Sequence, residues 1–336
     1  MPPTFIIAEA GVNHNGSIDL ALELIEAARS AGADAVKFQT FKAGLLATAS
    51  APKAAYQCRT TSATESQMQM LERLELDEAA HRKLMMRCAE AGIQFISSPF
   101  DLCSVDLLTE LGVAQFKVPS GEITNHPLLR RVAATARSVI LSTGMSTLGE
   151  VEEAVQVLQT SGAAQISVLH CVTEYPAPFE QINLRAMQTL KIAFQLPVGY
   201  SDHTPGTEIA VAAVALGAEI IEKHLTLDRK LPGPDHSSSL EPLEFAEMVN
   251  AIRRVESALG DGIKRPALCE LPNMVVARKS VVANRNLAAG HRLSSDDLDI
   301  RRPGNGLAPK LLPSLLGRTV RVAVDAGTSI HWDHLA

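Results

Sequence analysis

The sequence predicts a (β/α)8 barrel followed by a small β-rich domain, and three observations support this fold class. A unit of amphipathic helix, glycine and short apolar strand recurs up to about residue 259. The apolar runs are rich in β-branched residues, as is typical of parallel strands buried on both faces. After Leu259 the pattern changes, because glycine and proline turns then separate alternating short strands.

The first repeat begins with a helix for which Ser17 is a suitable N-cap. The apolar residues of this helix recur at helical spacing: Ile18, Ala21, Leu22, Ile25 and Ala28. Gly32 then ends the helix, and DAVKF follows as a strand. This order of helix, glycine and strand is the pattern that we trace through the rest of the chain.

The same pattern returns at Gly92 before IQFIS, Gly112 before AQFKV, Gly162 before QISVLH, and Gly217 before EIIEKH. With FIIAE, DAVKF, SVILS at 138–142 and PVGYS at 197–201, the predicted strands number eight. Strands that alternate with helices over about 250 residues indicate a closed barrel. An open doubly wound sheet is the alternative, and the lack of a G-x-G-x-x-G turn after the first strand weakens it.

Two segments do not follow this repeated pattern of helix, glycine and strand. Residues 43–73 form a long polar connection, which we interpret either as a lid or substrate wall or as an ordinary surface insertion. Residues 260–277 are interrupted by glycine and proline and read as a linker. The predicted organisation is therefore a barrel at 1–259, a linker at 260–277 and a β-rich domain at 278–336.

Composition excludes several classes of function. The 336-residue chain is 46% hydrophobic and carries a formal net charge of −6, without the basic patches of nucleic-acid-binding proteins. Its five cysteines are odd in number and lack C-x-x-C spacing, which fits reduced cytosolic thiols. No signal peptide or membrane-spanning run is visible. We expect a soluble cytoplasmic protein that binds neither nucleic acid nor membrane.

In a barrel of this kind, chemistry takes place where strands end and the following loops begin. Every predicted strand places polar or ionisable residues there: Glu9, Lys37, Gln39, Ser98, Lys117, Ser120, Glu122, Ser142, Thr143, His170, Thr173, Tyr175, Ser201, Asp202, His203, Glu222 and His224. A purely structural protein has no reason to concentrate charge on one face. The set therefore predicts an active site, whereas we interpret His14 and His170 as structural histidines.

Two lysines in this set predict an anion site. Lys37 and Lys117 at strand ends, near Ser120, Ser142 and Ser201, supply the positive charge and hydroxyl donors that a phosphate needs. A competing interpretation makes Lys117 a Schiff-base lysine, as in carbonyl aldolases. Glutamates at the same mouth, Glu9 and Glu122, are candidates for acid–base chemistry or for contacts with sugar hydroxyls.

Two histidines predict a metal site. His203 and His224 end the seventh and eighth strands, which are neighbours in a barrel, so their imidazoles should lie within several ångströms of each other. With Glu222 and Asp202 nearby, they form a nitrogen and oxygen set suited to Mn²⁺, Mg²⁺ or Co²⁺. Two direct protein ligands would leave positions open for water or a substrate oxygen. The alternative is a pair of hydrogen-bonded core histidines.

Segments in order along nearly the whole chain resemble those of the sialic acid synthases: AEAGVNHNG, VKFQTFKA, SSPFD, FKVPSGEI, LSTGM, HCVTEYP, GYSDHT, IEKHLTLD, GPDH and RRPGNG. These are barrel enzymes with a C-terminal antifreeze-like (SAF) domain. The resemblance implies condensation of phosphoenolpyruvate with an N-acyl hexosamine, by C–O cleavage, to give a nine-carbon 2-keto acid and phosphate. The alternative from another functional class is a sugar-binding or ice-binding protein whose barrel has no catalytic activity.

The acceptor sugar is open at this point. N-acetylmannosamine, which gives N-acetylneuraminate, is the default expectation. The stretches SGEITNHP, AMQTLK and VGYSDHTPG are at least as similar to the diacetyllegionaminate synthases, whose substrate is 2,4-diacetamido-2,4,6-trideoxymannose. These residues give no physical basis for separating a 6-hydroxyl from a 6-methyl group.

The resemblance also implies residue roles. The positions that match phosphoenolpyruvate contacts are Lys37, Lys117, Ser120, Ser142 and Ser201, and those that match sugar contacts are Gln39, Glu122, Tyr175 and Asp235. His203 and His224 match metal ligands, Glu222 acts through a bound water, and Glu9 matches a carboxylate at the reacting centre. Thr173 falls where some members have an asparagine near the phosphate. Arg302 matches an arginine that enters the partner subunit's active site, which implies a domain-swapped homodimer.

Overall fold

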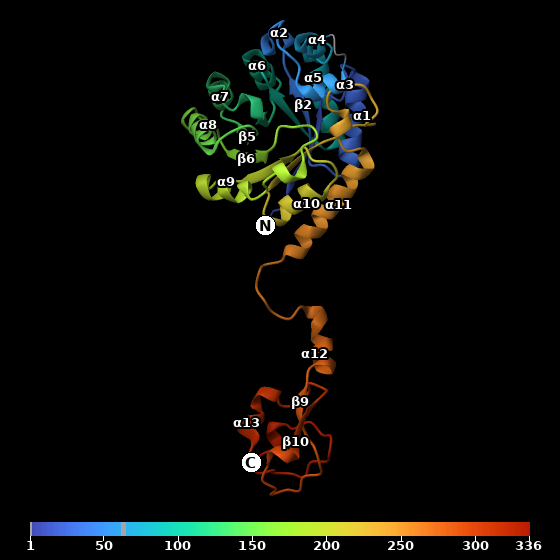
Figure 1. Ribbon diagram of the computed structural model, residues 1–336, viewed down its shortest axis with the longest axis vertical. Coiled ribbons are helices and arrows are strands. Elements are labelled where there is room, and N and C mark those ends of the chain that lie inside the picture. Colours follow the sequence, from blue (N-terminus) through green and yellow to red (C-terminus); the bar gives the residue numbers. More distant parts are fainter. Residues whose placement is uncertain (1, 62–64) are drawn as a thin grey trace. The chain divides into compact units, whose positions relative to one another are not determined.

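The computed structural model describes residues 2–61 and 65–336. The chain forms two compact units, Met1–Gly260 and Asp261–Ala336 (Figure 1). The first unit is a closed barrel of eight parallel strands in the order β1 to β8. The predicted fold class, a (β/α)8 barrel followed by a small β-rich domain, is confirmed.

The barrel strands agree closely with the apolar runs of the sequence. They are β1 (Phe5–Gly11), β2 (Ala35–Thr40), β3 (Gln94–Pro99), β4 (Gln115–Val118), β5 (Ser138–Ser142), β6 (Ile166–Cys171), β7 (Val198–Asp202) and β8 (Ile220–His224). Strand β1 pairs with both β2 and β8, which closes the ring. Because all strands are parallel, their carboxyl ends meet at one mouth.

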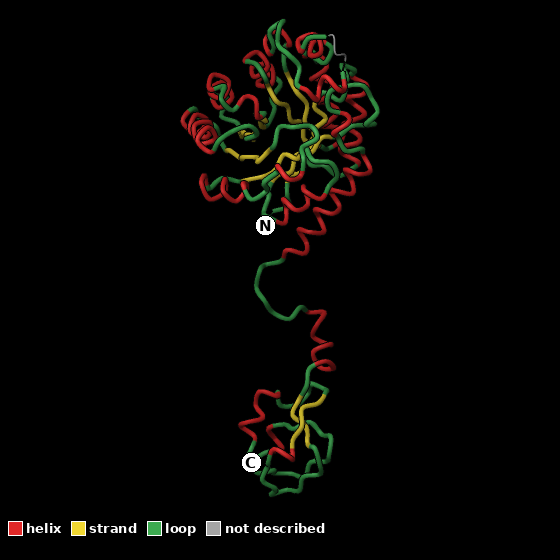
Figure 2. The backbone as a smooth tube through the Cα atoms, viewed as in Figure 1, coloured by secondary structure: helices red, strands yellow, loops and turns green. Residues whose placement is uncertain are grey.

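Helices surround the strands, as Figure 2 shows for the first unit. They are α1 (Ile18–Ser30), α2 (Ala43–Leu46), α3 (Ala55–Thr60), α4 (Gln67–Glu72), α5 (Glu78–Ala91), α6 (Leu102–Glu110), α7 (His126–Ala133), α8 (Leu148–Thr160), α9 (Ala186–Phe194), α10 (Glu208–Ala215) and α11 (Pro242–Leu259). The Ser17 hydroxyl accepts a hydrogen bond from the Leu20 amide and caps α1, as predicted. No helix in the described part of the chain is long and apolar enough to cross a membrane.

The predicted polar connection at 43–73 contains the three short helices α2, α3 and α4, with residues 62–64 outside the described part. Its buried apolar side chains Ala43, Met70 and Leu71 pack into a cluster with the flanking Phe41 and Leu74 and with Val12 of the loop after β1. The segment therefore has a core of its own beside the mouth of the barrel.

The second unit is built around a small antiparallel sheet. It contains α12 (Leu271–Ala277), β9 (Ser280–Ala283), β10 (Leu298–Arg301) and α13 (Leu312–Leu315), and β9 pairs with β10. Its core includes Val281, Leu293 and Ile330. The helix α12 lies within the predicted linker at 260–277, and the sheet lies within the predicted domain at 278–336.

Candidate active site

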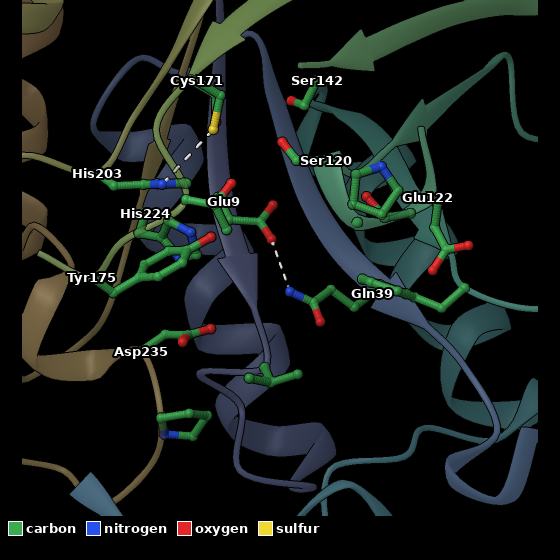
Figure 3. A pocket seen from close by; sticks show the side chains of 18 of the residues that line it. Glu9, Gln39, Ser120, Glu122, Ser142, Cys171, Tyr175, His203, His224 and Asp235 are labelled. Atoms are coloured by element: carbon green, nitrogen blue, oxygen red, sulfur yellow. Dashed lines mark hydrogen bonds between the residues drawn. The ribbon is translucent and has the colours of Figure 1, made fainter. Parts of the chain in front are cut away.

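A cavity of about 450 Å³ lies at the carboxyl ends of the barrel strands (Figure 3). Fourteen of the predicted site residues of the barrel line it: Glu9, Lys37, Gln39, Lys117, Ser120, Glu122, Ser142, Thr173, Tyr175, Ser201, His203, Glu222, His224 and Asp235. Arg302 belongs to the second unit and is exposed there, so its reach into an active site stays a prediction.

Four charged side chains form a buried network on the floor of the cavity. The Lys37 Nζ atom lies 2.7 Å from Glu9 Oε2 and 3.6 Å from Glu222 Oε2. The Lys117 Nζ atom lies 3.3 Å from Glu222 Oε1, on the other side of the same carboxylate. The pair of Lys37 and Glu9 follows from the register, because these residues are partners across β1 and β2.

The two carboxylates of this network differ in protonation. Burial raises the pKa of Glu9 to about 7, and the attraction of Lys37 offsets only part of this effect. Burial acts on Glu222 in the same direction, but Lys117 and Lys37 together lower its pKa to about 2. Carboxyl groups whose pKa values are pushed apart in this way can take different roles in acid–base chemistry. Glu222 is therefore a fixed anion, whereas Glu9 exchanges a proton near neutral pH.

Hydroxyl groups beside Lys117 form a site suited to an anion. The Ser120 hydroxyl accepts a hydrogen bond from the Gly144 amide at 2.9 Å. The buried hydroxyls of Ser142 and Thr173 have no hydrogen-bond partner among the described residues. A side chain at position 144 would not fit, because its Cβ would collide with Thr173 Oγ1. Unpaired buried donors are costly, so they indicate a ligand that accepts from them.

His203 and His224 face each other at the end of β7 and β8, with ring centroids 5.4 Å apart. The Nδ1 atom of His203 donates to the Val172 carbonyl at 2.7 Å, which leaves its Nε2 atom available to a ligand. The Nδ1 atom of His224 is buried without a hydrogen-bond partner in the described structure. Burial holds the pKa of His224 well below its usual range. The His224 ring thus offers a neutral nitrogen, as a metal ligand must. Burial also disfavours the charged form of His203, but Cys171 and the Val172 carbonyl outweigh it and raise the pKa of His203 above its usual value.

These two rings fit a divalent ion that is only partly coordinated by protein. Within residues 2–61 and 65–336, no group of three or more histidine, cysteine, aspartate and glutamate side chains is arranged to hold a metal ion. Two imidazoles would leave the remaining positions to water or to a substrate oxygen. The unpaired Nδ1 atom of His224 is the observation that favours a ligand here over a hydrogen-bonded core histidine.

An aromatic stack covers the histidine pair. The Tyr175 ring lies 4.1 Å from the His203 ring and 5.5 Å from the His224 ring, between centroids. The Tyr56 ring lies 4.9 Å from the Tyr175 ring, again between centroids. Asp235 lines the cavity beside them (Figure 3), and burial raises its pKa to about 6. The stack holds Tyr175 in place and shields the histidines from solvent.

Asp202 is a correction to the prediction. The sequence suggested Asp202 as a nearby oxygen ligand, but the cavity does not include it. Side chains alternate along a strand, so Asp202 points away from the cavity that Ser201 lines. Its carboxylate binds Lys223 Nζ at 2.7 Å, and both side chains are fully buried.

The remaining strand-end residues also have structural roles. Ser98 lines the cavity and accepts a hydrogen bond from Lys37 at 3.2 Å. Thr143 donates to the Leu169 carbonyl at 2.9 Å. His170 hydrogen-bonds the Ile182 carbonyl at 2.7 Å, and His14 accepts from the Gly16 amide at 3.0 Å, consistent with their interpretation as structural.

Several lining residues were not predicted individually. Cys171 lies 3.9 Å from His203 Nδ1, and it follows an apolar run without any distinguishing spacing. The segment between β2 and α5 adds a wall made of Leu46, Tyr56, Gln57, Gln67, Met70, Leu71 and Leu74. The helical spacing of Met70, Leu71 and Leu74 in SQMQMLERLEL is a sequence signal for part of this wall, but it covers too few residues to distinguish a helix from a polar connection.

Comparisons with known proteins agree with this arrangement. Residues 24–264 match the NeuB family, and residues 278–336 match the SAF domain. The N,N'-diacetyllegionaminic acid synthase of Campylobacter jejuni is 52% identical over 320 residues, covering 95% of this chain and 96% of that protein. The same enzyme of Legionella pneumophila is 46% identical over 335 residues, covering 98% and 94%. A crystal structure of N-acetylneuraminic acid synthetase from Leptospira borgpetersenii, in complex with citrate, has a TM-score of 0.71 and 38% identity, covering 81% of this chain and 90% of that chain.

Proposed function

The chain belongs to the NeuB family of phosphoenolpyruvate-dependent nonulosonate synthases, and on that premise we propose that it makes N,N'-diacetyllegionaminate and phosphate from phosphoenolpyruvate and 2,4-diacetamido-2,4,6-trideoxymannose. The identity of 52% with a synthase of that product, over almost the whole of both chains, carries this proposal. The N-acetylneuraminic acid synthetase shares only 38%. These values favour the diacetamido acceptor over N-acetylmannosamine, the default expectation from the sequence.

Phosphoenolpyruvate binds at the lysine and serine side of the cavity. Lys117 and the hydroxyls of Ser142 and Thr173 receive the phosphate, because Lys117 supplies positive charge and the two buried hydroxyls lack hydrogen-bond partners in the described structure. Lys37, on β2, neutralises the carboxylate of phosphoenolpyruvate. Buried charges of this kind are oriented before the substrate arrives, so they stabilise developing charge without reorganisation.

The reaction forms a carbon–carbon bond, and at C2 it replaces the bond to the phosphate oxygen with a bond to the oxygen of water. C3 of phosphoenolpyruvate attacks the aldehyde carbon of the open-chain sugar, and positive character develops at C2. Water then adds at C2, and the tetrahedral intermediate expels phosphate. Glu9 accepts the proton from this water, since its pKa of about 7 is suited to proton transfer near neutral pH. The aldehyde oxygen, which becomes an alkoxide as the carbon–carbon bond forms, takes up one proton to give the product hydroxyl, so the protons balance. Glu222, which stays ionised, stabilises the positive character that develops.

His203 and His224 would hold a divalent ion on the sugar side. When bound, such an ion supplies Lewis-acid polarisation of the aldehyde oxygen. The protein's part is orientation: the Val172 carbonyl fixes the tautomer of His203, and Tyr175 stacks on its ring. Asp235 and Gln39 line the same space and are positioned to hydrogen-bond the sugar hydroxyls.

The SAF domain has a role in this proposal through Arg302. We infer a domain-swapped homodimer in which Arg302 enters the active site of the partner subunit. Mixing the inactive variants Arg302→Ala and Lys117→Met tests this. If Arg302 acts between subunits, the mixed dimer regains one complete site and about a quarter of wild-type activity returns. If no activity returns after subunit exchange, Arg302 does not act between subunits.

Phosphate release tests the reaction itself. We expect release only when phosphoenolpyruvate, the diacetamido sugar and Mn²⁺ are all present, and we expect EDTA to abolish it. Lys117→Met should be inactive, whereas Lys191→Met, which alters an exposed lysine, should retain full activity. Release without sugar, or no release with any acyl hexosamine, would contradict the proposal. Trapping of a pyruvate adduct on Lys117 by borohydride would instead support a Schiff-base lyase.

A further inference from the structure

The wall of the cavity between β2 and α5 differs in chemistry from the strand ends. The strand ends supply lysines, glutamates and histidines, whereas the lining residues of this wall are apolar or uncharged among those described. Such a wall cannot take part in the charge chemistry of the reaction. It can contact those parts of the acceptor sugar that do not react.

The apolar part of the wall is rigid. Met70 and Leu74 are 1% and 7% exposed, and both pack into the cluster that includes Val12. Reciprocal hydrogen bonds between Ser66 and Gln69 cap the start of α4, at 3.2 Å and 3.0 Å. This cap fixes which face of the helix lines the cavity. The apolar surface is therefore present before a substrate binds.

Gln67 is the amide of this wall that is free to bind a ligand. The Gln57 side chain accepts from the Ala54 amide at 2.9 Å, and Gln39 donates to Glu9 at 3.4 Å. The Gln67 side chain lines the cavity and makes no hydrogen bond to a described residue. It is half-buried at the first position of α4, within one turn of Met70 and Leu71.

The two candidate acceptors differ at two carbons. The diacetamido sugar has an acetamido group at C4 and a methyl group at C6, where N-acetylmannosamine has a hydroxyl and a hydroxymethyl. An acetamido group needs a hydrogen-bond partner for its amide and apolar contact for its methyl, and a 6-methyl needs apolar contact alone. A carboxamide beside a rigid apolar surface offers both kinds of contact.

We propose that Gln67 hydrogen-bonds the 4-acetamido group, and that Met70 and Leu74 pack against this group and the 6-methyl. The wall then selects the acceptor, and this inference rests on the proposed function. A single neutral hydrogen bond at a half-buried site corresponds to a factor of about ten in affinity or rate. An apolar surface rejects an added hydroxyl by about a hundredfold at most. The two contacts should therefore contribute separately to selectivity.

Three sugars separate the two contacts. The third is 2-acetamido-2,6-dideoxymannose, which keeps the 6-methyl but has a 4-hydroxyl. In the Gln67→Leu variant, kcat/KM should fall about tenfold for the diacetamido sugar and change less than about twofold for the other two sugars. The matched control Glu72→Leu alters an exposed residue of the same helix and should leave all three values unchanged.

The outcomes distinguish the inference from the proposed function. If wild-type enzyme prefers N-acetylmannosamine, the proposed acceptor is wrong and the inference falls with it. If wild-type enzyme prefers the diacetamido sugar, but Gln67→Leu lowers all three values equally, Gln67 has only a structural role. Unchanged values for all three sugars would also overturn the inference while the proposed function stands.

Discussion

A buried ion pair next to the two histidines should make the barrel sensitive to the loss of either partner. Asp202 and Lys223 directly precede His203 and His224, and they are register partners across β7 and β8. The Lys223 Nζ atom lies 2.7 Å from Asp202 Oδ2, and neither side chain is exposed. The pair thus joins the ends of the two strands that carry the candidate metal ligands.

The size of the effect follows from what each substitution leaves behind. Removal of one partner of a buried pair leaves an uncompensated charge, which costs about 3–5 kcal/mol. In Lys223→Met, Asp202 keeps two hydrogen bonds from Thr204, at 2.9 Å and 2.8 Å. We therefore expect the lower end of this range, a loss of about 3 kcal/mol in the free energy of unfolding. The double variant Asp202→Leu/Lys223→Met should recover most of this loss, because no charge remains buried.

Urea unfolding can follow the two units separately, because a different spectroscopic signal reports on each. The single tryptophan, Trp332, lies in the second unit, so its fluorescence follows that unit, whereas far-UV circular dichroism mainly follows the helix-rich barrel. For a slope of about 3 kcal/mol per molar urea, the barrel midpoint of Lys223→Met should fall by about 1 M. The fluorescence midpoint should not move.

A matched control makes this result decisive. Lys191→Met breaks an exposed pair with Glu219, of 3.0 Å, and should cost less than about 1 kcal/mol. If Lys223→Met destabilises the barrel no more than Lys191→Met does, the buried pair is not a stabilising contact between these strands. A double variant as unstable as Lys223→Met would refute the argument from uncompensated charge.

Three further predictions concern the metal, pH and the second unit. The variants His203→Ala and His224→Ala should lose Mn²⁺-dependent phosphate release while keeping the circular dichroism of the wild type; activity that survives both changes would contradict the metal assignment. Burial lowers the pKa of His14 to about 4, below its value in the unfolded chain. The neutral ring therefore contributes about 3 kcal/mol to the free energy of unfolding above pH 6.5, and this contribution is lost as the pH falls towards 4. The barrel midpoint in urea should therefore fall between pH 7 and pH 4.5, and less steeply in His14→Asn; parallel profiles would exclude His14 as the cause. Asp297 accepts hydrogen bonds from His291 and Ser294 at 2.9 Å and 2.7 Å, so Asp297→Ala should lower the urea midpoint seen by Trp332 fluorescence and leave that of the barrel unchanged.

The barrel and the polar floor of the cavity could be predicted because parallel strands leave a strong signal. A strand buried on both faces reads as a continuous apolar run, so the polar residues within or at its carboxyl end stand out, as at Lys37, Lys117 and His224. Closure of the ring then brings these ends together whatever the intervening helices are. The direction of a side chain at a strand end is harder to predict, since a change of one position turns it to the other face. Asp202 was misplaced for this reason.

The wall at Gln67 and Met70 was outside the reach of the sequence for a different reason. Helix α4 spans only Gln67–Glu72, which is too short for its apolar spacing to separate from a polar connection. The direction in which Gln67 points depends on the cap at Ser66 and on packing against Val12, a contact distant in the chain. Tyr56 likewise reaches the site through tertiary packing on Tyr175.

A competition experiment tests the choice of acceptor most directly. Equal concentrations of 2,4-diacetamido-2,4,6-trideoxymannose and N-acetylmannosamine are offered with limiting phosphoenolpyruvate and Mn²⁺, and the products are separated by mass. We predict an excess of N,N'-diacetyllegionaminate over N-acetylneuraminate of about tenfold or more. Equal amounts, or an excess of N-acetylneuraminate, would contradict the proposed function.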